Sequence, residues 1–205
     1  MSNEFGVFAP VFESPHGYLA LLGLSDDDST DAVRLVRQCA AADIDCSAIL
    51  GLLRELNWRP TLVAAVAAAF LPLDTRITDA LWHRLDSGSW VVPQIAVVLS
   101  TVDPDFQTQA RLRLEAHCPL DTTELRALTM IERHSAAGPA GGIERSAKAA
   151  SALESIVSGI SPQPVWLASI VANSEHRALV ASDIDGGGRI AQHWCERFTQ
   201  IRKLI

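Results

Sequence analysis

Two aspartates and three glycines near the end of the chain form the pattern whose residue types could most directly do chemistry. Asp183 and Asp185 follow the apolar residues Val180 and Ala181 and precede the run Gly186–Gly188. Carboxylates two residues apart in a glycine-rich segment can ligate a cation or act as nucleophile and acid–base pair at a phosphoryl group. Each of these chemistries requires further residues at fixed positions along the chain.

Calcium binding is the first possibility for this segment. In a twelve-residue calcium loop, Asp183, Asp185 and Gly188 would occupy positions 1, 3 and 6. Position 5 is then Gly187 and position 12 is Trp194, where the ion requires a bidentate carboxylate. Two carboxylates without the twelfth-position ligand predict calcium binding that is weak or absent. We therefore expect a flexible glycine-rich turn before the last helix.

Phosphoryl chemistry is the second possibility. The stretch Val180–Gly186 resembles the first motif of haloacid-dehalogenase-type phosphatases, an apolar strand followed by Asp-x-Asp-Gly. That resemblance would make Asp183 the nucleophile and Asp185 the acid and base. However, Gly187 stands where the family has threonine, and only 20 residues follow Asp185, too few for the sheet and other motifs of such an enzyme. The phosphatase interpretation is therefore rejected, and a phosphate loop at the glycines lacks a preceding strand–helix context.

The histidines and cysteines do not form a metal-site pattern. His117 adjoins Cys118 and His193 lies two residues before Cys195, but neither pair has a second ligand pair at zinc-site spacing. No Gly-x-Ser-x-Gly segment marks a nucleophile. We predict no catalytic residue, no metal site and no cofactor. The four cysteines are expected to be free thiols in a reducing cytoplasm, because no signal peptide is apparent at the start of the chain.

Negative charge is concentrated in the first part of the chain. Residues 1–120 hold 15 acidic and 8 basic side chains, whereas residues 121–205 hold 9 of each. This balance opposes binding to nucleic acid or an anionic membrane, which requires clustered Lys and Arg, and it favours a basic protein partner. The candidate partner-binding residues are Asp26, Asp27, Asp28, Asp31, Asp43, Asp45, Asp103 and Asp105. For the run at 26–31, capping of the first helix is the preferred interpretation.

The elements that would position these side chains are helices. Residues 1–24 are rich in aromatic residues, Gly and Pro and match no helical period, which predicts an irregular N-terminal strap. Residues 25–136 form a helical-repeat region, in which amphipathic helices alternate with the wholly apolar segments at 61–71 and 91–99. One amphipathic stripe is Ile49, Leu53 and Leu56. A Gly/Ala/Pro loop is predicted at 137–142, followed by C-terminal helices at 143–205 that pack on the same body.

An internal echo indicates how these helices are arranged. Trp58 and Trp90 open two similar apolar segments 32 residues apart. The paired helices, punctuated by Asp and Pro, resemble HEAT and armadillo repeats, and this resemblance implies a short right-handed α-solenoid of antiparallel helix pairs. The segments Ser89–Gln94 and Asp103–Phe106 also resemble bacterial HEAT-like proteins encoded near type VI secretion genes.

The tryptophans are weighed between core and binding roles. Trp58 and Trp90 begin equivalent helices, so both are expected to pack between repeats. Trp82 and Trp166 are candidate exposed anchors, since Trp is enriched at interface hot spots. Burial is nevertheless the favoured interpretation of each tryptophan, because this side chain is mostly buried in folded proteins.

Three function classes follow from this architecture. The leading one is a non-enzymatic protein-binding module, most concretely an immunity protein that occludes a basic bacterial toxin or effector. The second is an adaptor or scaffold in a secretion assembly that uses apolar contacts. The third is a repeat-fold enzyme of the DNA glycosylase type, which would require a basic concave surface. No nucleic acid or membrane partner is predicted.

Overall fold

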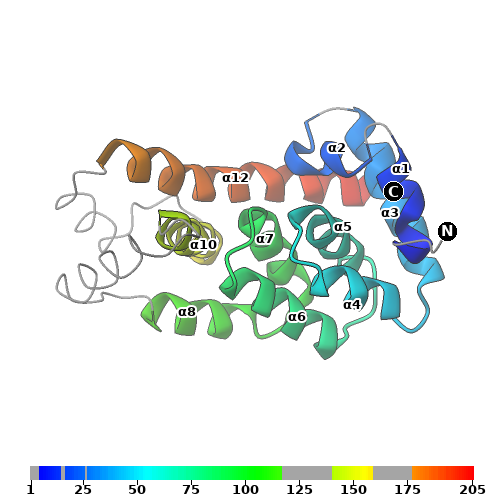
Figure 1. Ribbon diagram of the computed structural model, residues 1–205, viewed down its shortest axis with the longest axis horizontal. Helices are drawn as coiled ribbons and strands as arrows, with labels where there is room; N and C mark the ends of the chain where they lie inside the picture. Colours follow the sequence, from blue (N-terminus) through cyan, green and yellow to red (C-terminus); the bar gives the residue numbers. More distant parts are fainter. Residues whose placement is uncertain (1–4, 15–16, 26, 117–139, 159–176) are drawn as a thin grey trace.

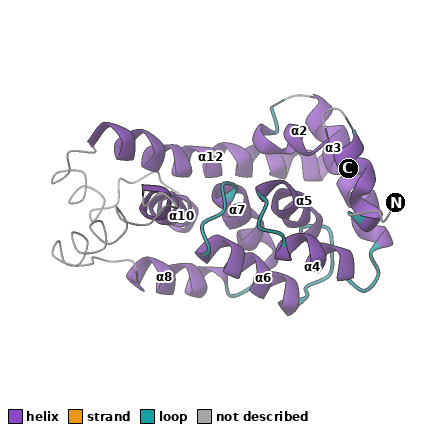
Figure 2. Ribbon diagram, in the orientation of Figure 1, coloured by secondary structure: helices purple, strands orange, loops and turns teal. Residues whose placement is uncertain are grey.

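A computed structural model describes residues 5–14, 17–25, 27–116, 140–158 and 177–205, and every regular element in these ranges is a helix (Figure 1). Figure 2 distinguishes only helices and their connecting loops in the same ranges. The all-helical prediction is confirmed for this part of the chain. Residues 117–136 of the predicted helical-repeat region and residues 159–176 of the predicted C-terminal helices lie outside the described residues.

The N-terminal segment is helical, so the predicted irregular strap is wrong. It forms the 3-10 helix η1 (Gly6–Phe8), α1 (Ala9–Glu13) and α2 (Gly17–Gly23), which lead into α3 (Asp27–Ala42). The buried side chains of Phe8, Val11 and Leu21 hold these helices against α3 and the body. Helices of one or two turns are too short to show a helical period, and tertiary packing stabilises them instead.

Two rows of helices form the centre of the molecule. The outer row is α4 (Ser47–Arg54), α6 (Thr75–Asp86) and α8 (Phe106–Ala116), and the inner row is α5 (Trp58–Ala68), α7 (Val92–Val102) and α10 (Ala140–Ser158) (Figure 1). Residues 60–68 of α5 and 92–99 of α7 are buried on every side. Their apolar side chains are sandwiched between the outer row and the helices on the opposite side.

Helix α4 is shorter than the sequence pattern indicates. It ends at Arg54, and Leu56, which we assigned to the buried stripe, lies in the α4–α5 turn with 90% of its surface exposed. The other members of the stripe, Ile49 and Leu53, are buried. Asn57 caps α5 by accepting a hydrogen bond from the backbone N–H of Arg59, at 3.1 Å, so the chain leaves the helix immediately before this cap.

A long last helix, α12 (Arg177–Leu204), runs across the inner row on the side away from the outer row (Figure 1). The backbone at 183–188 is part of this helix, so the predicted glycine-rich turn is wrong; the side chains of Asp183 and Asp185 are outside the described ones. Likewise, α10 begins at Ala140, inside the predicted loop at 137–142, whose first three residues are not described.

Close approach of α10 and α12 explains one of the helical glycines. The backbone N–H of Gly188 donates a hydrogen bond of 3.1 Å to Oγ of Ser151, and Oγ of Ser155 donates one of 3.3 Å to the carbonyl of Gly188. A Cβ atom at position 188 would lie 3.1 Å from that Ser151 oxygen. The absence of a side chain therefore lets the two helices pack closely, and tertiary packing overrides the low helix propensity of glycine.

Helix α12 is fixed to the body by both apolar and polar contacts. Trp194 and Phe198 are buried and stack on each other with ring centroids 4.4 Å apart. Trp194 Nε1 donates a hydrogen bond of 2.9 Å to the carbonyl of Leu21, and Arg197 Nε donates one of 2.8 Å to that of Leu24. These bonds satisfy two carbonyl groups at the end of α2. None of the described helices has the length and apolar character to cross a bilayer.

The carboxyl group of Glu154 on α10 is partly buried, and its ionisation provides a test of how α10 packs. Its Oε2 atom is buried without a hydrogen-bond partner in the described structure, and desolvation raises the pKa of the carboxyl group. A raised folded-state pKa means that ionisation destabilises the fold as the pH rises through it, and that this cost disappears below the unfolded-state pKa of about 4.3. We expect Glu154→Gln to raise the melting temperature at pH 7 and to have no advantage at pH 4. An equal gain at both pH values in thermal denaturation would contradict this assignment.

Candidate functional site

The predicted aspartates occupy two separate places, and the first is helix α3. Asp28 and Asp31 are exposed on its first turns, and Asp31 forms a 2.5 Å ion pair with Arg34. Asp26 lies outside the described residues, and the side chain of Asp27 is not described. An exposed pair of this kind contributes little to stability. Capping of α3 by this run depends on Asp26 and Asp27 and therefore stays a prediction.

The second place is one edge of the two helix rows. Arg76 at the start of α6 donates a 3.4 Å hydrogen bond to the carbonyl of Asp45, just before α4, and Trp82 of α6 bonds Asp103, just before α8. Asp86 at the end of α6 also pairs with Arg113 of α8, so the helices of the outer row run in the same direction. The turns that precede α4 and α6 lie side by side, and the turn that precedes α8 lies further along α6, beside Trp82. We call these three turns the acidic edge; it consists of residues 43–46, 70–74 and 103–105. Asp43 and Asp45 thus lie in one turn beside the start of α6, and Asp103 and Asp105 lie in another turn, beside Trp82.

Helix capping accounts for most of this acidity. Asp43 accepts hydrogen bonds from the backbone N–H groups of Ala48 and Ile49, at 3.1 and 2.9 Å, and its side chain is buried. Asp74 accepts from the N–H of Arg76 at 2.9 Å and pairs with its guanidinium group. Carboxylates at these positions satisfy unpaired N–H groups and complement the positive end of each helix dipole. The prediction that Asp43 contacts a partner is therefore wrong, because its oxygens are used inside the fold.

Asp103 has a structural role as well. Its Oδ1 accepts a hydrogen bond from the N–H of Asp105 at 2.9 Å, and its Oδ2 accepts one from Trp82 Nε1 at 2.6 Å. Trp82 is buried, stacks on Phe106, and has the guanidinium carbon of Arg113 over its ring at 4.1 Å. Trp82 is thus a core residue that joins α6 to α8. Burial, the favoured interpretation of Trp82, is therefore confirmed over the exposed-anchor alternative. Trp166 lies outside the described residues.

The residues of the acidic edge that face solvent are the remaining candidates for binding. Asp45 and Asp105 are exposed, and Ile44 and Leu73 beside them have 95% and 60% of their surface exposed. Hydrogen bonds from Ser47 lower the pKa of Asp45, and Arg76 lowers that of Asp74 mainly by hydrogen bonding to its side chain. Both carboxylates therefore stay ionised at mildly acidic pH. Sequence reasoning missed Ile44, Leu73 and Asp74, although Asp74 directly precedes a helical pattern and is a recognisable cap.

Asp43 allows the structural part of this edge to be tested. We expect Asp43→Ala to lower the free energy of unfolding by about 2 kcal/mol, because it leaves two helix N–H groups without a buried acceptor. The matched control is Asp105→Ala, at an exposed position in the turn before α8. It is expected to change the free energy of unfolding by less than about 0.5 kcal/mol. Urea denaturation of both variants measures the difference. Equal losses would contradict the assignment of Asp43 as the cap.

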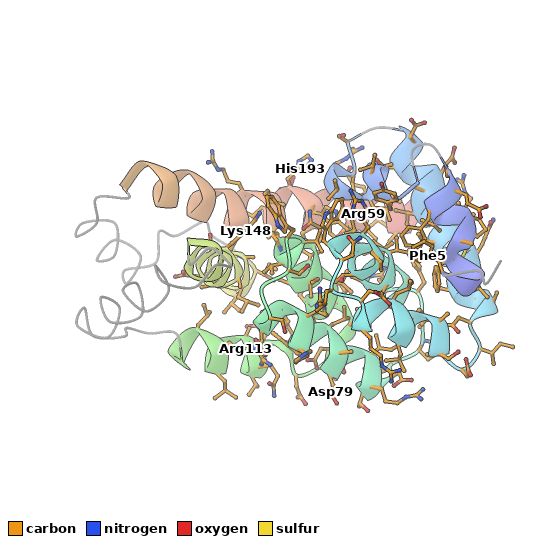
Figure 3. All side chains as sticks on the ribbon, viewed as in Figure 1. Phe5, Arg59, Asp79, Arg113, Lys148 and His193 are labelled. Atoms are coloured by element: carbon orange, nitrogen blue, oxygen red, sulfur yellow. The ribbon has the colours of Figure 1, made fainter. Side chains whose placement is uncertain are left out.

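A second cluster of polar side chains lies between α6, α8 and α10. Arg113 pairs with Asp86 through two hydrogen bonds, Nε to Oδ1 at 2.8 Å and Nη2 to Oδ2 at 3.0 Å. The shallow crevice beside this pair is otherwise lined by the aliphatic side chains of Leu85, Leu114, Ala149, Ala150 and Leu153. Figure 3 shows Arg113 on the outer row. The two charged groups satisfy each other, so the cluster is a contact between helices.

The sequence predicts free thiols and no metal site. Within the described part of the chain, no three His, Cys, Asp or Glu side chains lie close enough together to hold a metal ion. Cys39, Cys46 and Cys195 are free, and burial raises the pKa values of Cys39 and Cys46. These two thiols are therefore less ionised at neutral pH than an exposed cysteine, which makes them poor nucleophiles. His117 and Cys118 lie outside the described residues.

Trp90 is exposed, although we expected it to be buried. The side chain that we expected to pack between repeats has 69% of its surface exposed, whereas Trp58 is half-buried against Tyr18. The reason is a shift in register: Trp58 is the first residue of α5, but Trp90 stands two residues before α7 begins at Val92. The echo in the sequence therefore does not place the two rings equivalently.

Comparison of the chain with models of protein families, with curated proteins and with solved structures finds no match in any of the three.

Proposed function

We propose that the protein is a protein-binding module whose acidic edge binds a basic partner, most concretely as an immunity protein that occludes a bacterial toxin or effector. One observation carries this proposal. The acidic edge combines exposed carboxylates, at Asp45 and Asp105, with the exposed aliphatic side chains of Ile44 and Leu73. Apolar anchors surrounded by charged groups are the usual composition of a protein–protein interface.

The rigidity of the edge also supports binding. Each of its three turns is held by an aspartate whose oxygens accept backbone hydrogen bonds, namely Asp43, Asp74 and Asp103. A surface that is already ordered loses little conformational entropy when a partner binds. The remaining exposed carboxylates would steer a basic partner toward it and raise the association rate at low salt.

The arrangement of the helix rows supports a HEAT-like α-solenoid as the architectural part of the proposal. Parallel helices α4, α6 and α8 form one layer, and α5 and α7 form the layer behind it (Figure 1). Such stacks present their turns as extended binding edges. The free thiols of Cys39, Cys46 and Cys195 fit a cytoplasmic location, where a toxin-neutralising protein would act.

Affinity purification of the full chain from the cells that encode it, followed by mass spectrometry, tests the proposed function. A basic protein should be recovered at low salt and released as the salt concentration rises. With the purified partner, we expect Asp45→Asn/Asp105→Asn to weaken binding about tenfold, since each lost charge pair costs a fraction of the binding energy. The control Asp28→Asn/Asp31→Asn removes the same charge from α3 and should leave affinity within about twofold of the original by the same reasoning.

Two outcomes would contradict the proposal. The first is binding that does not respond to salt, which would favour the alternative of an adaptor that uses apolar contacts. The second is appreciable affinity for duplex DNA at low salt, which would favour the glycosylase alternative, because phosphate contacts depend steeply on salt. Ile44→Ser/Leu73→Ser separates the apolar contribution, since it leaves the charge of the acidic edge unchanged.

A further inference from the structure

At the opposite ends of α4 and α6 from the acidic edge lies a second surface, which we call the Trp90 edge. The Trp90 edge consists of the α4–α5 turn at 55–57 and the α6–α7 turn at 87–91. Leu56 and Trp90 are its most exposed apolar side chains. Since α4 and α6 are parallel neighbours, their C-terminal turns lie next to each other, and a contact between Arg84 and the carbonyl of Leu56 joins them.

Arg84 is buried beneath this edge without an acidic partner. Only 7% of its surface is exposed, and no ion pair with a carboxylate is found for it among the described residues. Its Nη2 donates a single long hydrogen bond of 3.4 Å to the carbonyl of Leu56, and its Nε has no hydrogen-bond partner in the described structure. A buried charge in this condition destabilises a fold unless a counter-charge is supplied.

The other charges at the Trp90 edge are mainly positive. Arg54 and Arg59 are exposed at the end of α4 and the start of α5, and the Lys148 amino group lies 5.7 Å from the centre of the Trp90 ring. Figure 3 shows Arg59 and Lys148 along the inner row. The acidic residues at this edge are the exposed Glu55 and Asp86, and Asp86 is paired with Arg113. The first turns of α5 and α7 point N–H groups toward this edge, and the last turns of α4 and α6 point carbonyl groups toward it, so the helix dipoles favour neither sign of charge there.

We propose that the Trp90 edge binds a segment of a partner protein in which a carboxylate side chain stands between apolar side chains. The apolar side chains would cover Leu56 and Trp90, and the carboxylate would replace the Leu56 carbonyl as the acceptor for Arg84. A carboxylate can take two guanidinium hydrogen bonds side by side, whereas the carbonyl takes one. This surface is separate from the acidic edge, so it adds a second partner site to the proposed function.

The stability of the isolated protein tests whether Arg84 is kept for binding. We expect Arg84→Met to give a melting temperature equal to or higher than that of the original chain, because it removes an uncompensated buried charge and keeps a side chain of similar length. Burial lowers the pKa of the Arg84 guanidinium group, in agreement with this cost. A clear fall in melting temperature would show that Arg84 supports the fold itself and would overturn the proposal.

Binding is measured with two matched peptide arrays. In the first, each fluorescent peptide holds one Glu between Leu, Ile, Phe or Trp residues; in the second, Gln replaces that Glu. We expect the full chain to select Glu peptides that bind at least tenfold more tightly than their Gln counterparts. Arg84→Met and Arg84→Lys should remove most of this difference, and Trp90→Ala should weaken both arrays. Arg54→Met, at an exposed arginine of the same edge, is the control and should retain the preference.

Three results would overturn the proposal. The first is equal affinity for Glu and Gln peptides. The second is a Glu preference that survives in Arg84→Met. The third is concentration-dependent self-association in sedimentation that Arg84→Met abolishes, because the occupant would then be a second copy of this chain. None of these results depends on the acidic edge. A failure of the Trp90-edge proposal is therefore distinguishable from a failure of the proposed function, which Asp45→Asn/Asp105→Asn tests.

Discussion

Trp194→Ala is expected to lower the free energy of unfolding by about 4 kcal/mol, the typical cost of removing a buried aromatic side chain. Trp194 is 1% exposed, stacks on Phe198, and donates a 2.9 Å hydrogen bond to the carbonyl of Leu21. The substitution leaves a cavity between α12 and α2 and leaves that carbonyl without its donor. Since domains are stable by only about 5–15 kcal/mol, this loss removes between about a quarter and four fifths of the stability of a typical domain.

Two further variants separate the contributions at Trp194. Trp194→Phe keeps a ring beside Phe198 but removes the hydrogen bond to Leu21, so a smaller loss of about 1–2 kcal/mol is expected. Leu204→Ala, at an exposed position of the same helix, is the control and should have almost no effect. Circular dichroism during thermal and urea denaturation measures all three. Equal stability of Trp194→Ala and Leu204→Ala would show that α12 does not pack on the body as described.

Gly188→Val is the second change for which a large effect is expected, a loss of about 3 kcal/mol, at the upper end of the range for overpacked cores. A Cβ at this position would meet Oγ of Ser151 at 3.1 Å, its carbonyl oxygen at 3.3 Å and Cβ of Ser155 at 3.4 Å. One of these neighbours is backbone and cannot rotate away. Helices α10 and α12 would have to separate, which would also lengthen the two hydrogen bonds that join them across this contact.

The same substitution at another helical glycine provides the control. A Cβ added to Gly51, in the middle of α4, meets no atom within 4 Å. Gly51→Val is therefore expected to leave stability unchanged or raise it by a few tenths of a kcal/mol, in line with the helix propensities of the two residues. Urea denaturation of both variants gives the comparison. Similar values for the two positions would mean that α10 and α12 do not approach each other closely at Gly188.

The parts of the fold that were predictable are those with strong apolar patterns. Helices α5 and α7 were expected at 61–71 and 91–99 and are found at Trp58–Ala68 and Val92–Val102, because continuous burial leaves an unmistakable apolar run. The glycine run before Arg189 was misinterpreted as a turn. Its helical conformation depends on the close approach of α10, which no local propensity encodes.

The candidate site was predictable only in composition. The aspartates of the turns before α4 and α8 were recognised and Asp74 was not. The placement of these turns follows from the parallel direction of α4, α6 and α8, which is a tertiary property. The expectation for Trp90 was wrong for a related reason, whereas the favoured burial of Trp82 is confirmed. Trp82 stacks on Phe106 of α8, whereas Trp90 precedes its helix and has 69% of its surface exposed.

The hydrogen bonds between α12 and α2 have a consequence for how the protein folds during synthesis. Trp194 and Arg197 reach carbonyl groups of Leu21 and Leu24, each across 173 positions of the chain. Contacts between such distant positions form late, because a long loop must close first. The N-terminal helices therefore leave the ribosome well before the residues that complete their packing exist. Nascent chains halted before Trp194 should be rapidly degraded or held by chaperones, and the rate of folding should be limited by the arrival of α12.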